Sequence, residues 1–247
     1  MAGFSRRELL SGAAALVLGE KLVAAEVIGG KLPFAAGSAP LPGAVNPAGW
    51  RFFTPAEVAS IEAIVDRIIP PDPQTPGGKE AGCATFIDRQ LAGGYGHRQG
   101  LYILGPFQDG NRQQGPQSEQ DPAQQYRAAL AAIDQHSRSH DTAAKTGRAF
   151  AELNSEEQDA ILRGIEEGSV ELEGLDGKKF FENLITDVQQ GFFADPLYGG
   201  NRNMCAWKMI GFPGARYDYR DWVSRHNEPY PHPPVSIQGR PEWNPKS

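Results

Sequence analysis

The chain has 247 residues, a length that suits one domain, and 40% of its residues are hydrophobic. Glycine (29 residues) and proline (20) are both frequent, so we expect a compact core with much loop around it. The formal net charge of −6 and the pI near 5.4 argue against a nucleic-acid partner, because phosphate backbones are bound by clustered Lys and Arg and the sequence has no such cluster.

The N-terminus has the pattern of an export signal. Two adjacent arginines precede an Ala/Gly-rich apolar stretch, Leu9–Gly19, which is too short to span a bilayer. The pattern resembles the bacterial twin-arginine signal, and its residues are Ser5, Arg6, Arg7, Leu9 and Leu10. Small residues at Val23-Ala24-Ala25 predict cleavage before Glu26, which makes residues 1–25 the signal peptide. The alternative is a basic start to an ordinary amphipathic helix. No apolar run of 18 or more residues follows, so no later membrane span is expected.

Residues 26–50 are rich in Ala, Gly and Pro without a clear period, and they predict a linker or an arm. The first helix is expected directly afterwards. Thr54 suits the N-cap, Pro55 suits the first helical position, and Glu57 completes a capping box. Apolar residues at helical spacing follow until the pair Pro70-Pro71 ends the element.

Four further helices are expected in the domain that we place at 51–247. The pattern predicts them over about 80–91, from 121 through 133, over 155–167 and over 178–190. Between the second and third, residues 95–120 predict a long surface loop. Few runs alternate between apolar and polar residues. The predicted class is therefore mainly α: a single irregular helical domain with long loops and an extended Pro-rich C-terminal tail, 229–245.

The sequence offers no recognisable cofactor site. The glycine cluster Gly93–Gly96 follows a predicted helix and lacks the spacing of a dinucleotide-binding turn. Covalent haem would need a Cys-x-x-Cys-His motif, but the two cysteines lie far apart. A P-loop and a Gly-x-Ser-x-Gly motif are also missing. We therefore predict no catalytic, cofactor-binding or metal-binding residue in this chain.

Two residue pairs leave alternatives open. Cys83 and Cys205 can form a disulfide in an oxidising periplasm, or they can be two small buried thiols. His136 and His140 are four residues apart near a predicted helix end, a spacing that suits a metal ion. Their neighbours are polar and no further ligand is near in sequence, so the other interpretation is a solvated helix face.

Aromatic and arginine side chains alternate with glycine and proline between residues 192 and 222. Trp, Tyr and Arg are the side chains that dominate interface hot spots, so this segment is a candidate partner interface. A self-packed irregular lid is the alternative. The candidate contact residues are Asp195, Tyr198, Asn201, Arg202, Trp207, Arg216, Tyr217, Tyr219, Arg220 and Trp222.

The same segment carries a family resemblance. Phe-Phe-Ala-Asp-Pro-x-Tyr-Gly-Gly-Asn-Arg starts at Phe192, and Trp-Lys-x-Ile-Gly-Phe-Pro-Gly-Ala-Arg-Tyr-Asp-Tyr-Arg-Asp starts at Trp207. Together they resemble the signature of the gluconate 2-dehydrogenase subunit 3 family, the small or gamma subunit. Shorter matches occur at 52–57, 69–70, 86–91 and 151–153, so the resemblance covers about residues 50–240.

The resemblance implies a heterotrimeric, membrane-associated dehydrogenase. In such a complex a large FAD-containing subunit oxidises gluconate or a related sugar acid, and a multihaem cytochrome c subunit passes the electrons to quinone. The small subunit supplies the twin-arginine signal and escorts the flavoprotein to the periplasmic side of the cytoplasmic membrane. The family assigns it no catalytic residue. Two alternatives are a self-sufficient periplasmic metal protein or enzyme that uses His136 and His140, and a free-standing scaffold or envelope-binding module.

Overall fold

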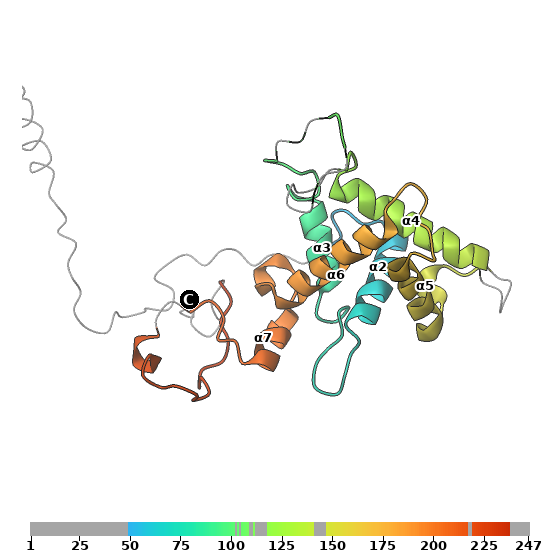
Figure 1. Ribbon diagram of the computed structural model, residues 1–247. Coiled ribbons are helices and arrows are strands. Elements are labelled where there is room, and N and C mark those ends of the chain that lie inside the picture. The colour runs from blue at the N-terminus through green and yellow to red at the C-terminus, as the bar shows by residue number, and fades with distance from the viewer. Residues whose placement is uncertain are drawn as a thin grey trace, which may run out of the picture. The chain divides into compact units, whose positions relative to one another are not determined.

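Helices make up the regular structure of the part of the chain that the computed structural model describes (Figure 1). This part comprises residues 49–101, 103, 105–108, 111, 118–140, 147–216 and 219–237, all within one unit that spans 41–242. Within these ranges the only β pairing is an isolated bridge between Gly214 and Val235. The mainly α class is therefore confirmed. The predicted export signal and nearly all of the predicted arm lie outside the described residues.

The first described helix, α2 (Pro55–Ile68), begins with the predicted capping box. The Thr54 hydroxyl accepts a hydrogen bond from the backbone N–H of Glu57, and the Glu57 carboxylate accepts one from the N–H of Thr54 at 2.7 Å. This reciprocal arrangement satisfies two of the amide groups that a helix start leaves unpaired. The helix buries Ile61 and Val65 on its inner face.

The other helices agree with the prediction where local sequence defines their ends. Helix α5 (Ser155–Glu167) matches on both sides, with an Asn154–Glu157 capping box and a left-handed Gly168 at its end. Helix α3 (Cys83–Leu91) begins later than predicted because Gly82 is left-handed. Helix α6 (Gly177–Phe193) runs beyond the predicted end at residue 190. Helices α4 (Pro122–His140) and α7 (Cys205–Ile210) complete the set, and α7 was not predicted.

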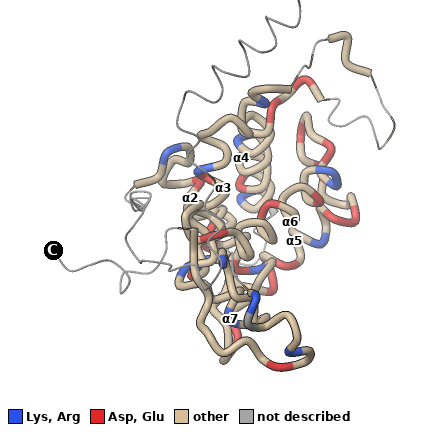
Figure 2. Tube along the Cα trace, turned by 90° about the vertical axis from the view of Figure 1, so that its left-hand side faces the viewer, with Lys and Arg blue, Asp and Glu red and all other residues tan. Residues whose placement is uncertain are grey.

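The core lies where α2, α3 and α6 meet, with α4 and α5 packed beside them and α7 against α6 (Figure 1). Helices α3 and α6 approach closely at Gly191, where an added Cβ would lie 3.1 Å from the Phe86 ring. The largest fully buried apolar side chains are Phe150, Ile61, Ile64, Ile87, Leu91, Leu130, Ile133, Ile165, Leu184, Val65 and Val188. Acidic and basic residues lie interspersed along these helices (Figure 2). Among the described helices, none is both long and apolar enough to cross a membrane.

Two buried carboxylates connect the helices. Asp88 on α3 is fully buried and accepts the backbone N–H groups of Arg51, Phe52 and Phe53 at 2.9–3.0 Å, so it fixes the chain just before α2. It also accepts a hydrogen bond from Arg89 at 2.6 Å. Charge-assisted hydrogen bonds of this kind are about twice as strong as neutral ones. The Phe52-Phe53 and Asp88-Arg89 motif segments therefore belong to one structural joint.

The second carboxylate, Asp187 on α6, accepts hydrogen bonds from two phenols. The hydroxyl of Tyr126 on α4 lies 2.7 Å away, and that of Tyr95, in the loop after α3, lies 3.2 Å away. Burial raises the pKa of Asp187, and the two phenol hydrogen bonds offset part of that rise. Burial and the neighbouring carboxylate also raise the pKa of both tyrosines, so the phenols remain protonated donors.

Candidate partner interface

The segment after α6 is irregular, and internal hydrogen bonds hold it in place. Asp195 caps the short 3₁₀ helix Pro196–Tyr198, with its Oδ1 accepting the N–H of Leu197 at 2.9 Å. The same carboxylate accepts the Ser236 hydroxyl at 2.6 Å and the Ile237 N–H at 2.8 Å. Asp195 is only 8% exposed. It therefore ties the C-terminal end of the described chain to the end of α6.

Asn201 connects α6 to α7. Its side chain is fully buried; Nδ2 donates to the carbonyl of Ala194 and Oδ1 accepts the N–H of Ala206, both at 2.9 Å. Its backbone is left-handed (φ 45°), a conformation that Asn tolerates better than most residues. Asn203 and Met204 are also left-handed, with φ of 57° and 55°. The chain thus enters α7 through a strained turn that the Asn201 hydrogen bonds stabilise.

The Gly-Gly-Asn-Arg part of the motif packs closely against two other segments, the end of α6 and the start of α3. A Cβ on Gly200 would lie 2.0 Å from the carbonyl oxygen of Gly191 in α6. Arg202 contacts the start of α3. Its backbone N–H donates to the Ala81 carbonyl at 3.0 Å, and its guanidinium donates to the Thr85 hydroxyl at 2.7 Å. Arg202 remains exposed to solvent although it makes these contacts.

Trp207 is a packing residue rather than a surface residue. It is 6% exposed, and its indole N–H donates to the Phe193 carbonyl at 2.8 Å. Its ring contacts that of Phe212 edge-on, with centroids 5.2 Å apart. Asp195, Asn201 and Trp207 were all candidate contact residues. In the structure their side chains are buried, and their hydrogen bonds hold the segment together.

Tyr230 contacts three residues of the segment, Arg216, Tyr219 and Trp222. The Arg216 guanidinium donates to the Pro233 carbonyl at 2.9 Å and lies 5.4 Å from the Tyr230 ring centroid. Tyr230 contacts the rings of Tyr219 and Trp222 at 5.7 and 5.4 Å. These contacts are of the kind that the self-packed alternative predicts, and the partner interface stays a prediction.

Other candidate residues keep an outward surface. Tyr198 is 47% exposed and Tyr219 is 37% exposed. Arg220 is exposed at the start of the short 3₁₀ helix Arg220–Trp222, and Trp222 is half-buried. Tyr217 lies outside the described residues.

The most exposed apolar side chains near α7 were not predicted. Phe193, Met209, Ile210 and Phe212 are 42%, 50%, 56% and 44% exposed. Met209, Ile210 and Phe212 lie in the last turn of α7 and directly after it, and we call these three residues the α7 face. The sequence reasoning missed them because a helix of six residues is too short to show a period. The available signal was the run Met209-Ile210-Gly211-Phe212, in which apolar residues flank a glycine that can end a helix.

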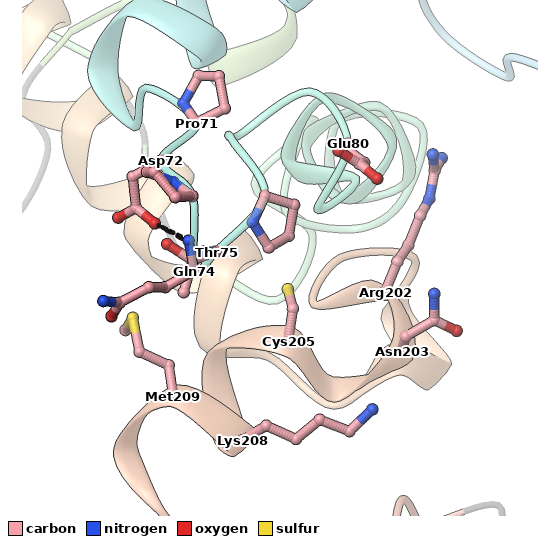
Figure 3. A pocket seen from close by; sticks show the side chains of 12 residues that line it. Pro71, Asp72, Gln74, Thr75, Glu80, Arg202, Asn203, Cys205, Lys208 and Met209 are labelled. Atoms are coloured by element: carbon pink, nitrogen blue, oxygen red, sulfur yellow. Dashed lines mark hydrogen bonds between the residues drawn. The ribbon is translucent and has the colours of Figure 1, made fainter.

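A cavity of about 570 Å³ lies beside the α7 face. The loop 71–76 forms one wall, and Cys205, Lys208 and Met209 of α7 form another (Figure 3). Asp72 fixes the loop, since its Oδ1 accepts the N–H groups of Gln74 and Thr75 at 2.7 Å. These backbone hydrogen bonds lower the pKa of Asp72.

Cys83 and Cys205 are free thiols in the structure. Burial, and secondarily the nearby Cys205, raises the pKa of Cys83 to about 12. Burial also raises the pKa of Cys205. Thiolates are the reactive form of cysteine, so these shifts disfavour nucleophilic chemistry at either residue. The disulfide remains a prediction.

His136, the described member of the α4 histidine pair, belongs to no metal-binding group of the described residues. Nowhere in these ranges do three or more His, Cys, Asp or Glu residues lie together as ligands would. His136 is half-buried, and the neighbouring Asp134 accepts hydrogen bonds from the Ser60 hydroxyl (3.1 Å) and the Phe150 N–H (3.0 Å). The side chain of His140 lies outside the described part.

Comparison with known proteins gives one result. The sequence profile of the family described as gluconate 2-dehydrogenase subunit 3 matches residues 55–214, more than half of the chain. The match starts at the first residue of α2 and includes α7 and its glycine-rich flanks. No curated protein and no solved structure matches the chain significantly.

Proposed function

The chain belongs to the gluconate 2-dehydrogenase subunit 3 family, and from this premise we propose that it is the non-catalytic small subunit that assembles with the flavoprotein of the complex and escorts it during export. Membership makes the chain a subunit of a gluconate 2-dehydrogenase complex, which implies other subunits. The observation that carries the proposal is the family match across every described helix from α2 to α7.

The chemistry of the buried groups supports a non-catalytic role. General acids and bases need a free position that can reach a substrate proton. Asp88 and Asp195 use their carboxylate oxygens to bind backbone N–H groups, and Asp187 binds two phenols. These contacts make all three carboxylates parts of the scaffold. We therefore assign oxidation of the sugar acid to a large FAD-containing subunit, and electron transfer to quinone to a multihaem cytochrome c subunit.

The proposed signal and the proposed periplasmic location both follow from export of the assembled pair. Twin-arginine export carries proteins that are already folded, so one signal can serve a subunit and the partner bound to it. The Ser5-Arg6-Arg7 sequence would supply that signal. The complex would then act in the periplasm, with membrane association provided by the cytochrome subunit.

Co-expression tests the proposal. The large subunit is produced with and without this chain, and FAD-dependent sugar-acid oxidation is measured in periplasmic and cytoplasmic fractions. We expect periplasmic activity only when this chain is present, and the isolated chain should oxidise no sugar acid. Equal periplasmic activity in both strains would overturn the escort role. Turnover by the isolated chain would overturn the non-catalytic role.

A further inference from the structure

We propose that Cys83 and Cys205 form a disulfide after export, and that this bond fastens the start of α7 to the start of α3. The inference rests on the proposed function for the compartment alone, because the periplasm oxidises thiols whereas the cytoplasm keeps them reduced. Both cysteines are free thiols in the structure. They lie more than 100 residues apart in the chain, so sequence alone left their pairing open.

Backbone and side-chain hydrogen bonds bring the two cysteine-bearing segments together. The N–H of Arg202 donates to the carbonyl of Ala81 at 3.0 Å, and the Arg202 guanidinium donates to the Thr85 hydroxyl at 2.7 Å. Cys83 lies between these two residues and is the first residue of α3. Cys205 follows Arg202 by three residues and is the first residue of α7. The starts of the two helices are therefore neighbours in the fold.

The thiols themselves are close as well. Cys83 belongs to the apolar core, and Cys205 packs against that core. Burial raises the pKa of Cys83, and electrostatic interaction with Cys205 raises it further. Such interactions weaken with distance, so this one indicates neighbouring sulfur atoms. The backbones approach closely at the same place, since an added Cβ on Gly82 would lie 2.6 Å from the carbonyl oxygen of Gly199.

The two cysteines differ in their access to solvent. Cys83 is fully buried, whereas Cys205 is partly exposed. Cys205 lines the cavity of about 570 Å³ next to the loop 71–76, and its side chain points from α7 toward that loop (Figure 3). The rate of thiol–disulfide exchange depends on access to the sulfur. An oxidant therefore reaches Cys205 first, and Cys83 completes the reaction from inside the fold.

The oxidant that we assign is another disulfide, either glutathione disulfide or the disulfide of a thiol oxidoreductase. The Cys205 thiolate attacks one of its sulfurs, so a mixed disulfide forms and the oxidant's S–S bond breaks with release of one thiolate. The Cys83 thiolate then attacks the Cys205 sulfur, which forms the internal disulfide and releases the second thiolate of the oxidant. The two cysteines lose two electrons and two protons, and the oxidant becomes two thiols.

The reaction is expected to be slow without a catalyst. Burial raises the pKa of Cys205 as well as that of Cys83, so little of either thiol is ionised at neutral pH. Only the thiolate attacks a disulfide. Uncatalysed disulfide exchange takes minutes to hours even in ordinary cases, so incubation with glutathione disulfide must last at least that long.

The bond would hold a part of the fold that local structure does not stabilise. Helix α7 has six residues, and a helix this short depends on tertiary contacts. Asn203 and Met204, directly before Cys205, are left-handed, a conformation that disfavours residues with a Cβ. A disulfide across a long chain segment removes many conformations from the unfolded chain. The oxidised chain should therefore keep α7 against α3 more persistently than the reduced chain.

The first test compares the purified full chain after incubation with glutathione disulfide and after incubation with dithiothreitol. We expect both thiols to disappear, the mass to fall by two hydrogens, and a digest to contain Cys83 linked to Cys205. The thermal midpoint should rise by at least about 5 °C on oxidation. Two thiols that still react with a maleimide after unfolding would refute the pairing, as would a bond between two chains. An unchanged midpoint would refute the fastening role.

Single variants test which cysteine is attacked first. In Cys83→Ala, Cys205 should retain one glutathione as a stable mixed disulfide. In Cys205→Ser, Cys83 should stay unmodified, because the folded chain shields it from the oxidant. Neither variant should gain thermal stability on oxidation. Cys205→Ser changes the partly exposed residue, so it remains informative if Cys83→Ala does not fold. Glutathione on Cys83 in Cys205→Ser would contradict the assigned order of attack.

Trapping of thiols in cells tests the compartment. Cells are quenched with acid, and free thiols are labelled with a maleimide in the periplasmic and cytoplasmic fractions. We expect the disulfide in periplasmic chains and free thiols in cytoplasmic chains, including the variant Arg6→Lys/Arg7→Lys. Periplasmic chains with free thiols would sink the inference although export stands. A chain absent from the periplasm would contradict the proposed export, whereas oxidation of the purified chain would still decide whether the two cysteines pair.

Discussion

At the scale of single residues, the buried carboxylates determine how the chain segments join. Asp88 accepts three backbone N–H groups from the segment before α2, and no side chain without an acceptor can replace it. Because this joint sets the entry to α2, it also orders the Thr54 cap. Loss of the Asp88 carboxylate should therefore be costly.

We predict that Asp88→Ala lowers the free energy of unfolding by about 3–5 kcal/mol, because it leaves three N–H groups without their acceptor. Urea unfolding followed by circular dichroism measures the change. Asp88→Asn keeps one oxygen but aims an amide group at a donor, so we expect a smaller loss. A loss below about 1 kcal/mol in Asp88→Ala would show that water or a rearranged backbone replaces these bonds.

Asp187 should make stability depend on pH in the opposite sense from a salt-bridged carboxylate. Its pKa is raised in the folded state, mainly by burial, so folding favours its protonated form. The contribution is full below the ordinary value of 3.8 and is lost as pH rises through the folded-state pKa. Asp187→Asn cannot ionise. We predict that the variant's stability relative to the unaltered chain increases as pH rises across that window. Thermal unfolding at a series of pH values tests this, and a pH-independent difference would contradict it.

At the scale of elements, two glycines of the motif distinguish two reasons for needing glycine. Gly200 allows close packing, and Gly211 allows a left-handed backbone. Gly200→Ala would place a Cβ 2.0 Å from the Gly191 carbonyl, so α6 and the turn before α7 must move apart. We predict a loss of at least about 2 kcal/mol in unfolding free energy, measured by urea unfolding. Gly211→Ala is the matched control: its Cβ meets open space, and only the left-handed φ of 70° costs about 1 kcal/mol. Equal losses in the two variants would mean that the close approach at Gly200 is unimportant.

The elements also show what can be predicted from sequence. Caps made of neighbouring residues, such as Thr54 with Glu57 and Gly168 after α5, are local, so these helix ends were predicted correctly. Helix α7 is too short for periodicity, and its existence depends on Asn201 and Trp207 contacts. The aromatic segment was identified as a candidate interface, but which of its side chains face outward was not predictable. That depends on contacts such as Asp195 with Ser236, 41 residues apart in the chain.

At the scale of the whole molecule, the proposed escort role makes two demands on the chain: a surface that binds the large subunit, and the predicted N-terminal signal as an address. The role needs both, because a signal alone exports only the chain that carries it, and a docking surface alone leaves the complex in the cytoplasm. The two demands can be separated by substitution, since the signal residues lie within 5–10 and the described residues begin at 49.

The double substitution Arg6→Lys/Arg7→Lys tests the address. It preserves the positive charge but replaces the planar guanidinium groups, so any effect reflects recognition of arginine itself. We predict that this chain and the large subunit both stay in the cytoplasm, where they can still be isolated as a complex. Immunoblots of the periplasmic and cytoplasmic fractions locate both proteins. Periplasmic activity that survives Arg6→Lys/Arg7→Lys would contradict twin-arginine escort, because a route that accepts lysine in place of both arginines does not depend on that signal.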